Sequence, residues 1–359
     1  MSSVSSIEWT DRTWNPVRGC AVVSPGCVNC YAMKQAHRFS GMYKAAGLDG
    51  PYQVPGPYYG LTKATKAGPQ WTGAVRTVPE TVLEPCSWRT PQRVFVNSMS
   101  DLFHEAVPDD FVVEVFATMA VASRHTFQIL TKRPERMLEF LTSRGRSADV
   151  AVAVFKRFSS LREADRRSRS ALEVWPLPNV WLGVSAEDQR RADERIPLLL
   201  ETPAAVRFLS AEPLLGPLDL MPFLDAGRET GGPAGWQSET SLDWVIVGGE
   251  SGSGARPVNV AWIRSVVRQC RASQVPVFVK QLGTRVIDRN DAGFDGTFED
   301  SWPVAIVEED RIEHDLDGTR DGYQGAPVRI HLRDRKGGNP AEWPEDLRVR
   351  AFPCRGGVS

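Results

Sequence analysis

The stretch Arg93-Val-Phe-Val-Asn-Ser-Met-Ser100 joins a short apolar run to a polar turn, and repeats of this pattern decide the fold class. Apolar residues at successive positions are typical of a strand whose two faces are both buried. Five further runs follow, at Phe127–Thr131, Val180–Ser185, Val206–Ser210, Trp244–Gly248 and Val275–Val279. A weaker run at Ile7–Trp14 indicates one more strand before them. The sequence therefore predicts a parallel β-sheet.

Helical patterns lie between several of these strands, at Asp109–Ser123, Pro134–Thr142, Ala148–Ser168, Ala186–Leu200 and Asn259–Ser273. The alternation of strands and helices predicts βα units, in which the strands run parallel. The number of units favours a partial or full (β/α) barrel. A doubly wound open sheet is the alternative arrangement.

The domain organisation follows from where the apolar runs stop. We assign residues 1–284 to the barrel and residues 285–359, where charge rises, to a C-terminal extension packed on it. Segment 40–90 is rich in Gly, Pro and Tyr, and we interpret it as a long inserted loop. A second Gly/Ser/Pro-rich insertion covers residues 226–241.

The composition limits the function classes. The 359 residues include 43 basic and 44 acidic side chains, so the net charge of −1 gives no sign of a nucleic-acid or membrane partner. Six cysteines in a chain of this length do not form a secreted disulfide framework. The N-terminus lacks a signal peptide, and no apolar run is long enough to span a bilayer. We expect a soluble cytoplasmic protein.

Polar residues follow the predicted strands. The candidate binding residues are Ser98, Asp101, Lys132, Glu187, Ser210, Glu212, Gly248, Gly249, Glu250, Lys280 and Gln281. Carboxyl ends of parallel strands share one rim, where such folds bind ligands, although helix capping explains some of these positions. Backbone amides of the Gly248–Gly254 loop are suited to contact an anionic ligand, and a merely flexible turn is the alternative.

Three cysteines, Cys20, Cys27 and Cys30, lie in the loop at residues 14–31 with the spacing C-x6-C-x2-C. Three close thiolates suit a [4Fe-4S] cluster or a zinc ion, and unligated thiols are a third interpretation. Zinc would need His37 as its fourth ligand, about 10 Å along a helix from Cys30, which is far for one tetrahedral ion. We therefore favour a cluster. With three protein ligands, one of its irons keeps an open coordination position.

This loop resembles the cluster-binding loop of the radical S-adenosylmethionine (radical SAM) superfamily, whose three cysteines follow the first strand of a partial (β/α) barrel. The common spacing there is C-x3-C-x2-C, with an aromatic residue before the third cysteine. Here Asn29 precedes Cys30 and Tyr31 follows it.

A closer resemblance rests on Trp9–Pro16, Phe95–His104, Leu130–Pro134, Phe208–Pro213, Val247–Ser251 and Val279–Gly283. These motifs are similar to those of the phage- and prophage-borne three-cysteine-motif proteins, a radical SAM-like family of unknown function. Its members are often encoded beside a methyltransferase- or nuclease-like partner protein, so the resemblance implies such a partner.

The resemblance implies that an electron donor reduces the cluster and that S-adenosylmethionine is cleaved to a 5′-deoxyadenosyl radical. Asp101 or Glu187 would then accept from the methionine amino group, and Lys132 or Arg133 would bind its carboxylate. Ser98, Ser210, Glu212 and the Gly248–Glu250 turn would contact the remainder of the cofactor. Lys280 and Gln281 would face the cofactor or the substrate.

The substrate is open, and a nucleic acid is one candidate. Aromatic residues together with Arg and Lys in segments 63–93 and 144–170 suit it, although loop packing and solvated helix faces explain them more simply. Two other functions remain open. One is a non-catalytic iron–sulfur or zinc protein that binds a partner in a phage or defence system. The other is a nucleic-acid hydrolase that uses the rim carboxylates with a divalent metal.

Overall fold

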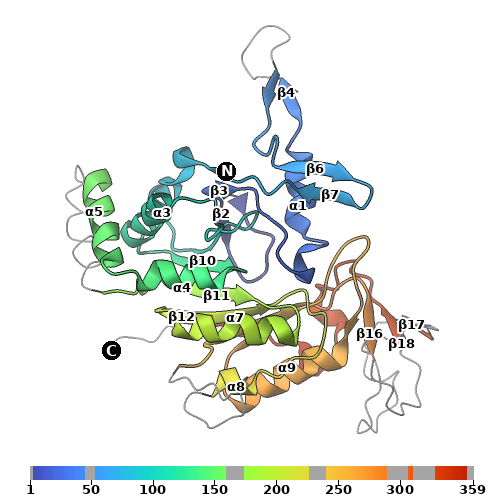
Figure 1. Cartoon of the computed structure of the whole chain (residues 1–359). Helices are drawn as coiled ribbons and strands as arrows, with labels where there is room; N and C mark the ends of the chain where they lie inside the picture. The colour runs from blue at the N-terminus through green and yellow to red at the C-terminus, as the bar shows by residue number, and fades with distance from the viewer. Residues whose placement is uncertain are drawn as a thin grey trace. The chain divides into compact units, whose positions relative to one another are not determined.

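The computed structural model describes residues 3–44, 53–158, 174–225, 240–288, 306–309 and 328–353. Most of the predicted insertion at 226–241 and the second half of the predicted helix Ala148–Ser168 lie outside these residues. The chain divides into two compact units (Figure 1). Unit 1 contains Met1–Val184 and Glu201–Val206, and unit 2 contains Ser185–Leu200 and Arg207–Ser359.

The fold is mixed α/β, with an eight-stranded main sheet in the order β1-β2-β9-β10-β11-β12-β13-β15. Its strands are β1 (Ser3–Val4), β2 (Arg12–Trp14), β9 (Arg93–Val96), β10 (Thr126–Thr131), β11 (Val180–Ser185), β12 (Val206–Ala211), β13 (Trp244–Gly248) and β15 (Val277–Gln281). Strand β1 is antiparallel to β2, and the other seven form a parallel sheet. Parallel strands in sequence order have the topology of an open, partial (β/α) barrel. A doubly wound sheet would reverse its order partway.

The helices of unit 1 are α3 (Asp109–Val121), α4 (Pro134–Thr142) and α5 (Arg146–Phe158). Helix α3 begins after Pro108 with Asp109 and Asp110, whose negative charges suit a helix N-terminus. The Arg146 guanidinium contacts the Asp109 carboxylate at 3.0 Å and thereby joins α5 to the start of α3. Phe116 of α3 packs on Phe140, with ring centroids 5.5 Å apart.

Segment 40–90 contains regular structure instead of the long loop that its composition indicated. It forms the hairpins β4 (Met42–Lys44)–β5 (Gln53–Pro55) and β6 (Thr62–Thr65)–β7 (Gly68–Trp71), the strand β8 (Arg76–Thr77) and the short helix α2 (Glu84–Ser87). Strand β8 pairs with β3 (Val17–Arg18). Hairpin β6–β7 lies against helix α1 (Tyr31–Arg38), where Leu61 and Trp71 are buried (Figure 1). The Gly and Pro residues of this segment predict its turns, but the pairing of β6 with β7 also depends on their packing against α1.

In unit 2, aromatic side chains of neighbouring strands pack on one another. Trp244 of β13 packs on Phe208 of β12 and on Phe278 of β15, with ring centroids 5.6 and 6.3 Å apart. Its helices are α7 (Gln189–Glu201), α8 (Met221–Leu224) and α9 (Val260–Ala272). Helix α7 begins three residues later than predicted. The Asp188 side chain accepts from Arg191 N and so caps the N-terminus of the helix at this point.

A second sheet has the order β14 (Val258–Asn259), β16 (Val286–Asp288), β18 (Val328–His331) and β17 (Ile306–Glu309). It pairs a strand of the predicted barrel segment with three strands of the predicted extension. The last described residues also return to β15, where Val279 N donates to Val349 O and Ala351 N donates to Val277 O. Trp244 Nε1 donates to Ala351 O as well. The extension is therefore packed on the strands before it.

None of the helices in the described parts of the chain combines the length and the apolar character that crossing a bilayer requires.

Three glycines of unit 2 allow backbone segments to approach closely. A Cβ atom on Gly249 would lie 2.3 Å from Leu282 O, and one on Gly283 would lie 2.7 Å from Glu250 O. A Cβ atom on Gly337 would lie 2.5 Å from Gly283 O. These glycines hold the Gly-rich loop against the segments after β15 and β18.

Gly249→Ala should therefore lower the free energy of unfolding by about 2 kcal/mol or more, because the methyl group meets rigid backbone. Thermal denaturation followed by circular dichroism measures the change. Gly216→Ala is the matched control, since a Cβ atom at Gly216 has nothing within 4 Å. Equal melting temperatures for the two variants would contradict the close-approach explanation.

Candidate functional site

The cysteine loop follows β2, the first parallel strand, and is fixed to the turn that follows β9. Val17 N donates to Asn97 Oδ1 at 3.2 Å, and Asn97 N donates to Trp14 O at 2.7 Å. At the far end of the loop, Tyr31 Oη donates to the Ser98 carbonyl at 2.8 Å. The loop is thus held at its start and its end by one neighbouring turn.

Gly19, directly before Cys20, has a positive φ of 90°. A Cβ atom there would lie 2.3 Å from Ala74 O, in the segment between β7 and β8. Only glycine satisfies both conditions without strain. The predicted insertion therefore fixes the backbone that presents Cys20.

The three cysteines are free thiols of intermediate exposure. Cys20 and Cys30 pack against one apolar cluster, which includes Met33, Tyr58 and Trp71. Burial raises the pKa of the Cys20 thiol to about 12, and the Asp101 carboxylate and the other two cysteines contribute further. Burial also raises the pKa of Cys30. The three sulfur atoms are close enough to influence one another electrostatically.

Helix α1 begins at Tyr31, directly after Cys30. His37, on this helix, contacts Thr62 Oγ1 through Nδ1 at 3.1 Å, toward β6. Across the described ranges, no group of three or more His, Cys, Asp or Glu side chains is arranged to hold a single metal ion.

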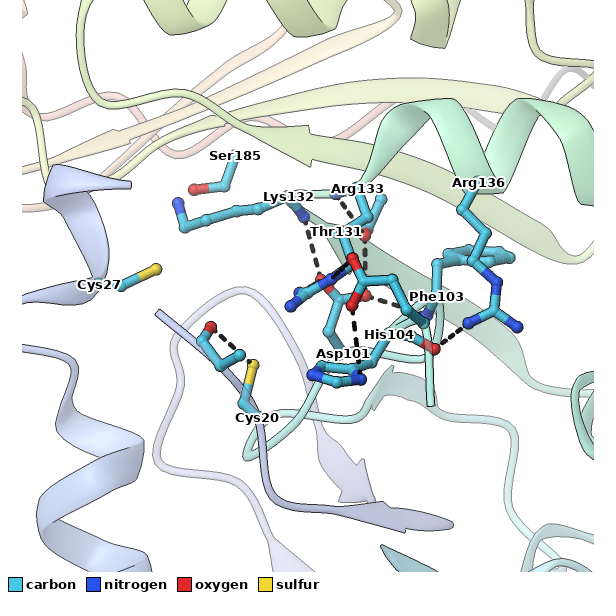
Figure 2. A network of polar contacts seen from close by, with 12 residues as sticks. Cys20, Cys27, Asp101, Phe103, His104, Thr131, Lys132, Arg133, Arg136 and Ser185 are labelled. Atoms are coloured by element: carbon cyan, nitrogen blue, oxygen red, sulfur yellow. Dashed lines mark hydrogen bonds and ion pairs between the residues drawn. The ribbon is translucent and has the colours of Figure 1, made fainter. Parts of the chain in front are cut away.

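A buried polar network lies beside Cys20 and is organised by Asp101 (Figure 2). The Asp101 carboxylate accepts from Phe103 N at 3.0 Å, from Thr131 Oγ1 at 2.8 Å and from Lys132 N at 3.2 Å. It also pairs with Arg133 Nη1 at 3.0 Å. Arg133 reaches the exposed Glu105 through Nε at 2.8 Å. Asp101 thus joins the turn after β9 to the end of β10.

The electrostatics of this network favour a charged Arg133. Burial alone would lower the pKa of Arg133, but the carboxylates of Asp101 and Glu105, together with Cys20, raise it on balance. Burial lowers the pKa of His104, and the nearby positive charge of Arg133 lowers it further. His104 Nδ1 accepts from Ala106 N at 3.1 Å, so the proton of the neutral ring is on Nε2.

Three buried nitrogen atoms in this region have no hydrogen-bond partner within the described part of the chain. They are Arg133 Nη2, His104 Nε2 and Asn97 Nδ2. Buried donors normally have partners, because an unsatisfied one is unfavourable by about 1–3 kcal/mol. Arg133 and His104 lie beside Cys20 (Figure 2), and their unsatisfied donors suit acceptor atoms of a bound group. This is the observation by which the site fits a ligand.

In unit 2, residues at the ends of β12, β13 and β15 come together around Glu212. Lys280 Nζ lies 3.0 Å from Glu212 Oε1, and Ser210 Oγ lies 3.2 Å from Glu212 Oε2. A Cβ atom on Gly248 would lie only 3.0 Å from Glu212 Oε1. Four of the residues predicted from the sequence therefore share one polar cluster.

The remaining candidates of unit 2 have partners of their own. Buried Glu187 pairs with Arg195 Nη1 at 3.2 Å, and Glu250 pairs with Arg256 Nη2 at 2.6 Å. Gln281 Nε2 donates to Gly249 O at 2.9 Å, and Gly249 N donates to Gln281 O. The amide of Gly249 is therefore used within the fold.

The sequence predicted the carboxylates and two of the cations that neutralise them, Arg133 and Lys280. Arg195, Arg256 and His104 were not among the predicted site residues. Arg195 follows Glu187 by eight residues and Arg256 follows Glu250 by six, and neither spacing indicates an ion pair. The assigned cofactor roles of Asp101, Ser98, Lys132, Glu187 and Glu250 stay predictions.

A protein-family model matches most of the chain. A family model described as "Protein of unknown function (DUF5131)" matches residues 4–324. No curated protein and no solved structure matches the chain.

Replacing Asp101 should destabilise unit 1, because Arg133 would remain buried without its buried carboxylate partner. We expect Asp101→Asn to lower the free energy of unfolding by about 3 kcal/mol. Glu105→Gln removes the exposed partner of the same arginine and should lower it by less than about 1 kcal/mol. Urea denaturation of the two variants measures both values. A small effect of Asp101→Asn would show that the network does not organise the two turns.

Proposed function

The chain belongs to the DUF5131 family, and we propose that it is a radical SAM-like iron–sulfur protein. In this proposal Cys20, Cys27 and Cys30 hold a [4Fe-4S] cluster. The observation that carries it is the position of the three thiols, on the loop after the first parallel strand of a partial barrel topology.

The ligand set is our reason to favour a cluster over a single zinc ion. Structural zinc takes four protein ligands, whereas three thiolates are enough to hold a four-iron cluster with one iron left open. His37, the candidate fourth ligand for zinc, is bonded to Thr62.

When bound, the cluster and S-adenosylmethionine would supply reductive cleavage of a carbon–sulfur bond, with electrons from an external donor. The chain would bind and orient these groups. Arg133 Nη2 and His104 Nε2 are buried donors that suit anionic or carbonyl oxygens of the cofactor. Asp101, which already accepts four hydrogen bonds, would position Arg133 rather than bind the methionine amino group.

The residues around Glu212 are suited to a ligand with hydroxyl groups. Ser210 and Lys280 hold the Glu212 carboxylate in one orientation, and Gly248 allows this carboxylate to lie close to the backbone at the end of β13. A carboxylate fixed in this manner accepts from ribose hydroxyls, as the resemblance implies for Ser210 and Glu212. The Lys280 charge offsets that of Glu212, which makes this cluster a poor site for a hydrolytic divalent metal.

Metal analysis of protein purified without oxygen tests the proposal. We expect about four iron and four sulfide per chain, and Cys27→Ala should lose most of both. Cys86→Ala is the matched control, because Cys86 is a free thiol of α2 with intermediate exposure. One zinc per chain, or equal iron in Cys27→Ala and the parent protein, would overturn the proposal.

A second measurement separates an enzyme from a non-catalytic cluster protein. Reduced protein with S-adenosylmethionine should release 5′-deoxyadenosine, and the release should require Cys27. A full cluster without any release would favour the partner-binding alternative, in which a methyltransferase- or nuclease-like protein is the natural partner. Magnesium-dependent cleavage of a nucleic acid that survives Cys20→Ala would favour the hydrolase alternative.

A further inference from the structure

Exposed apolar side chains are concentrated beside the cysteine loop. Among the described residues, eight of the twelve large exposed hydrophobic side chains lie between Val22 and Tyr59. Tyr31 is 47% exposed, Phe39 46% and Tyr59 50%. Such a concentration in a soluble unit is typical of an interaction surface, whereas single exposed apolar residues need no explanation.

The same segment is strongly basic, although the chain as a whole is nearly neutral. From Arg18 to Arg76 the sequence has seven lysines and arginines and one acidic residue, whereas the net charge of the chain is −1. Arg38, Lys63, Lys66 and Arg76 are exposed, and Lys34 is partly exposed. The net charge therefore hides a local excess of positive charge around the cysteines.

Helix α1 separates its two faces cleanly. Ala32, Met33 and Ala36 are buried in the cluster with Leu61 and Trp71. Tyr31, Lys34 and Arg38 have the spacing of the opposite face, and they form a stripe about 10 Å long that begins next to Cys30. The buried face fixes the helix, so the position of the stripe does not depend on a ligand.

Hydrogen bonds connect the end of this stripe to the segment before β6. Tyr58 N donates to Phe39 O at 3.3 Å, and Arg76 Nη2 donates to the Tyr59 carbonyl at 3.1 Å. Phe39, Tyr59 and Arg76 thus belong to one continuous part of unit 1. We call the six residues Tyr31, Lys34, Arg38, Phe39, Tyr59 and Arg76 the basic–aromatic surface.

We propose that the basic–aromatic surface binds single-stranded nucleic acid. Ammonium and guanidinium groups suit phosphates, and exposed aromatic rings stack on bases of any sequence. A duplex would contact the cations alone, because its bases are already stacked. An acidic protein would also use the cations, but it offers no row of flat rings for Tyr31, Phe39 and Tyr59. Binding does not require the cluster; the role of the bound strand as substrate rests on the proposed function.

Fluorescence anisotropy with a labelled thymidine oligonucleotide of about 20 residues tests the charged part of the surface. The double variant K34E/R38E should bind at least about 10-fold more weakly, and the slope of log K against log salt should fall by about 1.4. The double variant R268E/R271E makes the same charge change at two exposed residues of α9 and should bind as the parent does. Equal losses in both variants would mean that general charge, and not this surface, binds the strand.

A second pair of variants tests the aromatic residues of the surface. Phe39→Ala should weaken binding about fivefold or more through lost stacking. Phe155→Ala removes a ring that is 67% exposed on α5 and should leave affinity unchanged. Two results would overturn the proposal. A duplex that binds more tightly than the single strand would indicate a duplex partner. Heparin binding that the charge variants weaken equally and that Phe39→Ala leaves unchanged would indicate an acidic partner.

The failures of the two proposals are distinguishable. If the protein holds a cluster but does not bind the oligonucleotide, the surface proposal is wrong and the proposed function is unaffected. Protein without iron that binds the oligonucleotide through Phe39 and Arg38 would do the reverse. The Cys27→Ala variant should retain oligonucleotide affinity, because Cys27 is not part of the surface.

Discussion

The hydrogen bonds of Asn97 are the constraint on which the cysteine loop depends. This residue ends β9 with a φ of 61° and joins the segment after β2 through its own amide and its side-chain oxygen. Asn tolerates this left-handed conformation better than most residues because its side chain can bond to nearby backbone. The loop therefore takes its shape from a neighbouring strand end as well as from its own sequence. Gly19 and the segment around Ala74 complete the support from the other side.

Carboxylates at the strand ends are each neutralised by a cation of the same unit. The pairs are Asp101–Arg133, Glu187–Arg195, Glu212–Lys280 and Glu250–Arg256. Ion pairs out of water contribute little to stability on balance, because desolvation opposes the attraction between the charges. Their effect here is to fix orientation: each carboxylate presents one geometry and carries little net charge into its surroundings.

Much of the fold was predictable from local pattern. The strands at Val180–Ser185 and Trp244–Gly248 and the helix at Pro134–Thr142 have the predicted bounds, because apolar runs and Pro or Gly punctuation define them directly. The hairpins of segment 40–90 were not predicted; the short strands of β6–β7 are stabilised by contact with α1, which local pattern does not show. Of the site, the sequence predicted the clustering of Ser210, Glu212, Gly248 and Lys280, but not the unsatisfied donors Arg133 Nη2 and His104 Nε2. Those depend on which atoms the folded chain leaves without a partner.

The last described residues have a consequence for the edge of the main sheet. Strand β15 ends this sheet, and an edge strand presents backbone groups with which another chain can pair. Val349 and Ala351 occupy part of this edge, and the Trp244 indole holds the same segment in position. Edge-to-edge pairing with a second molecule would first have to displace this segment.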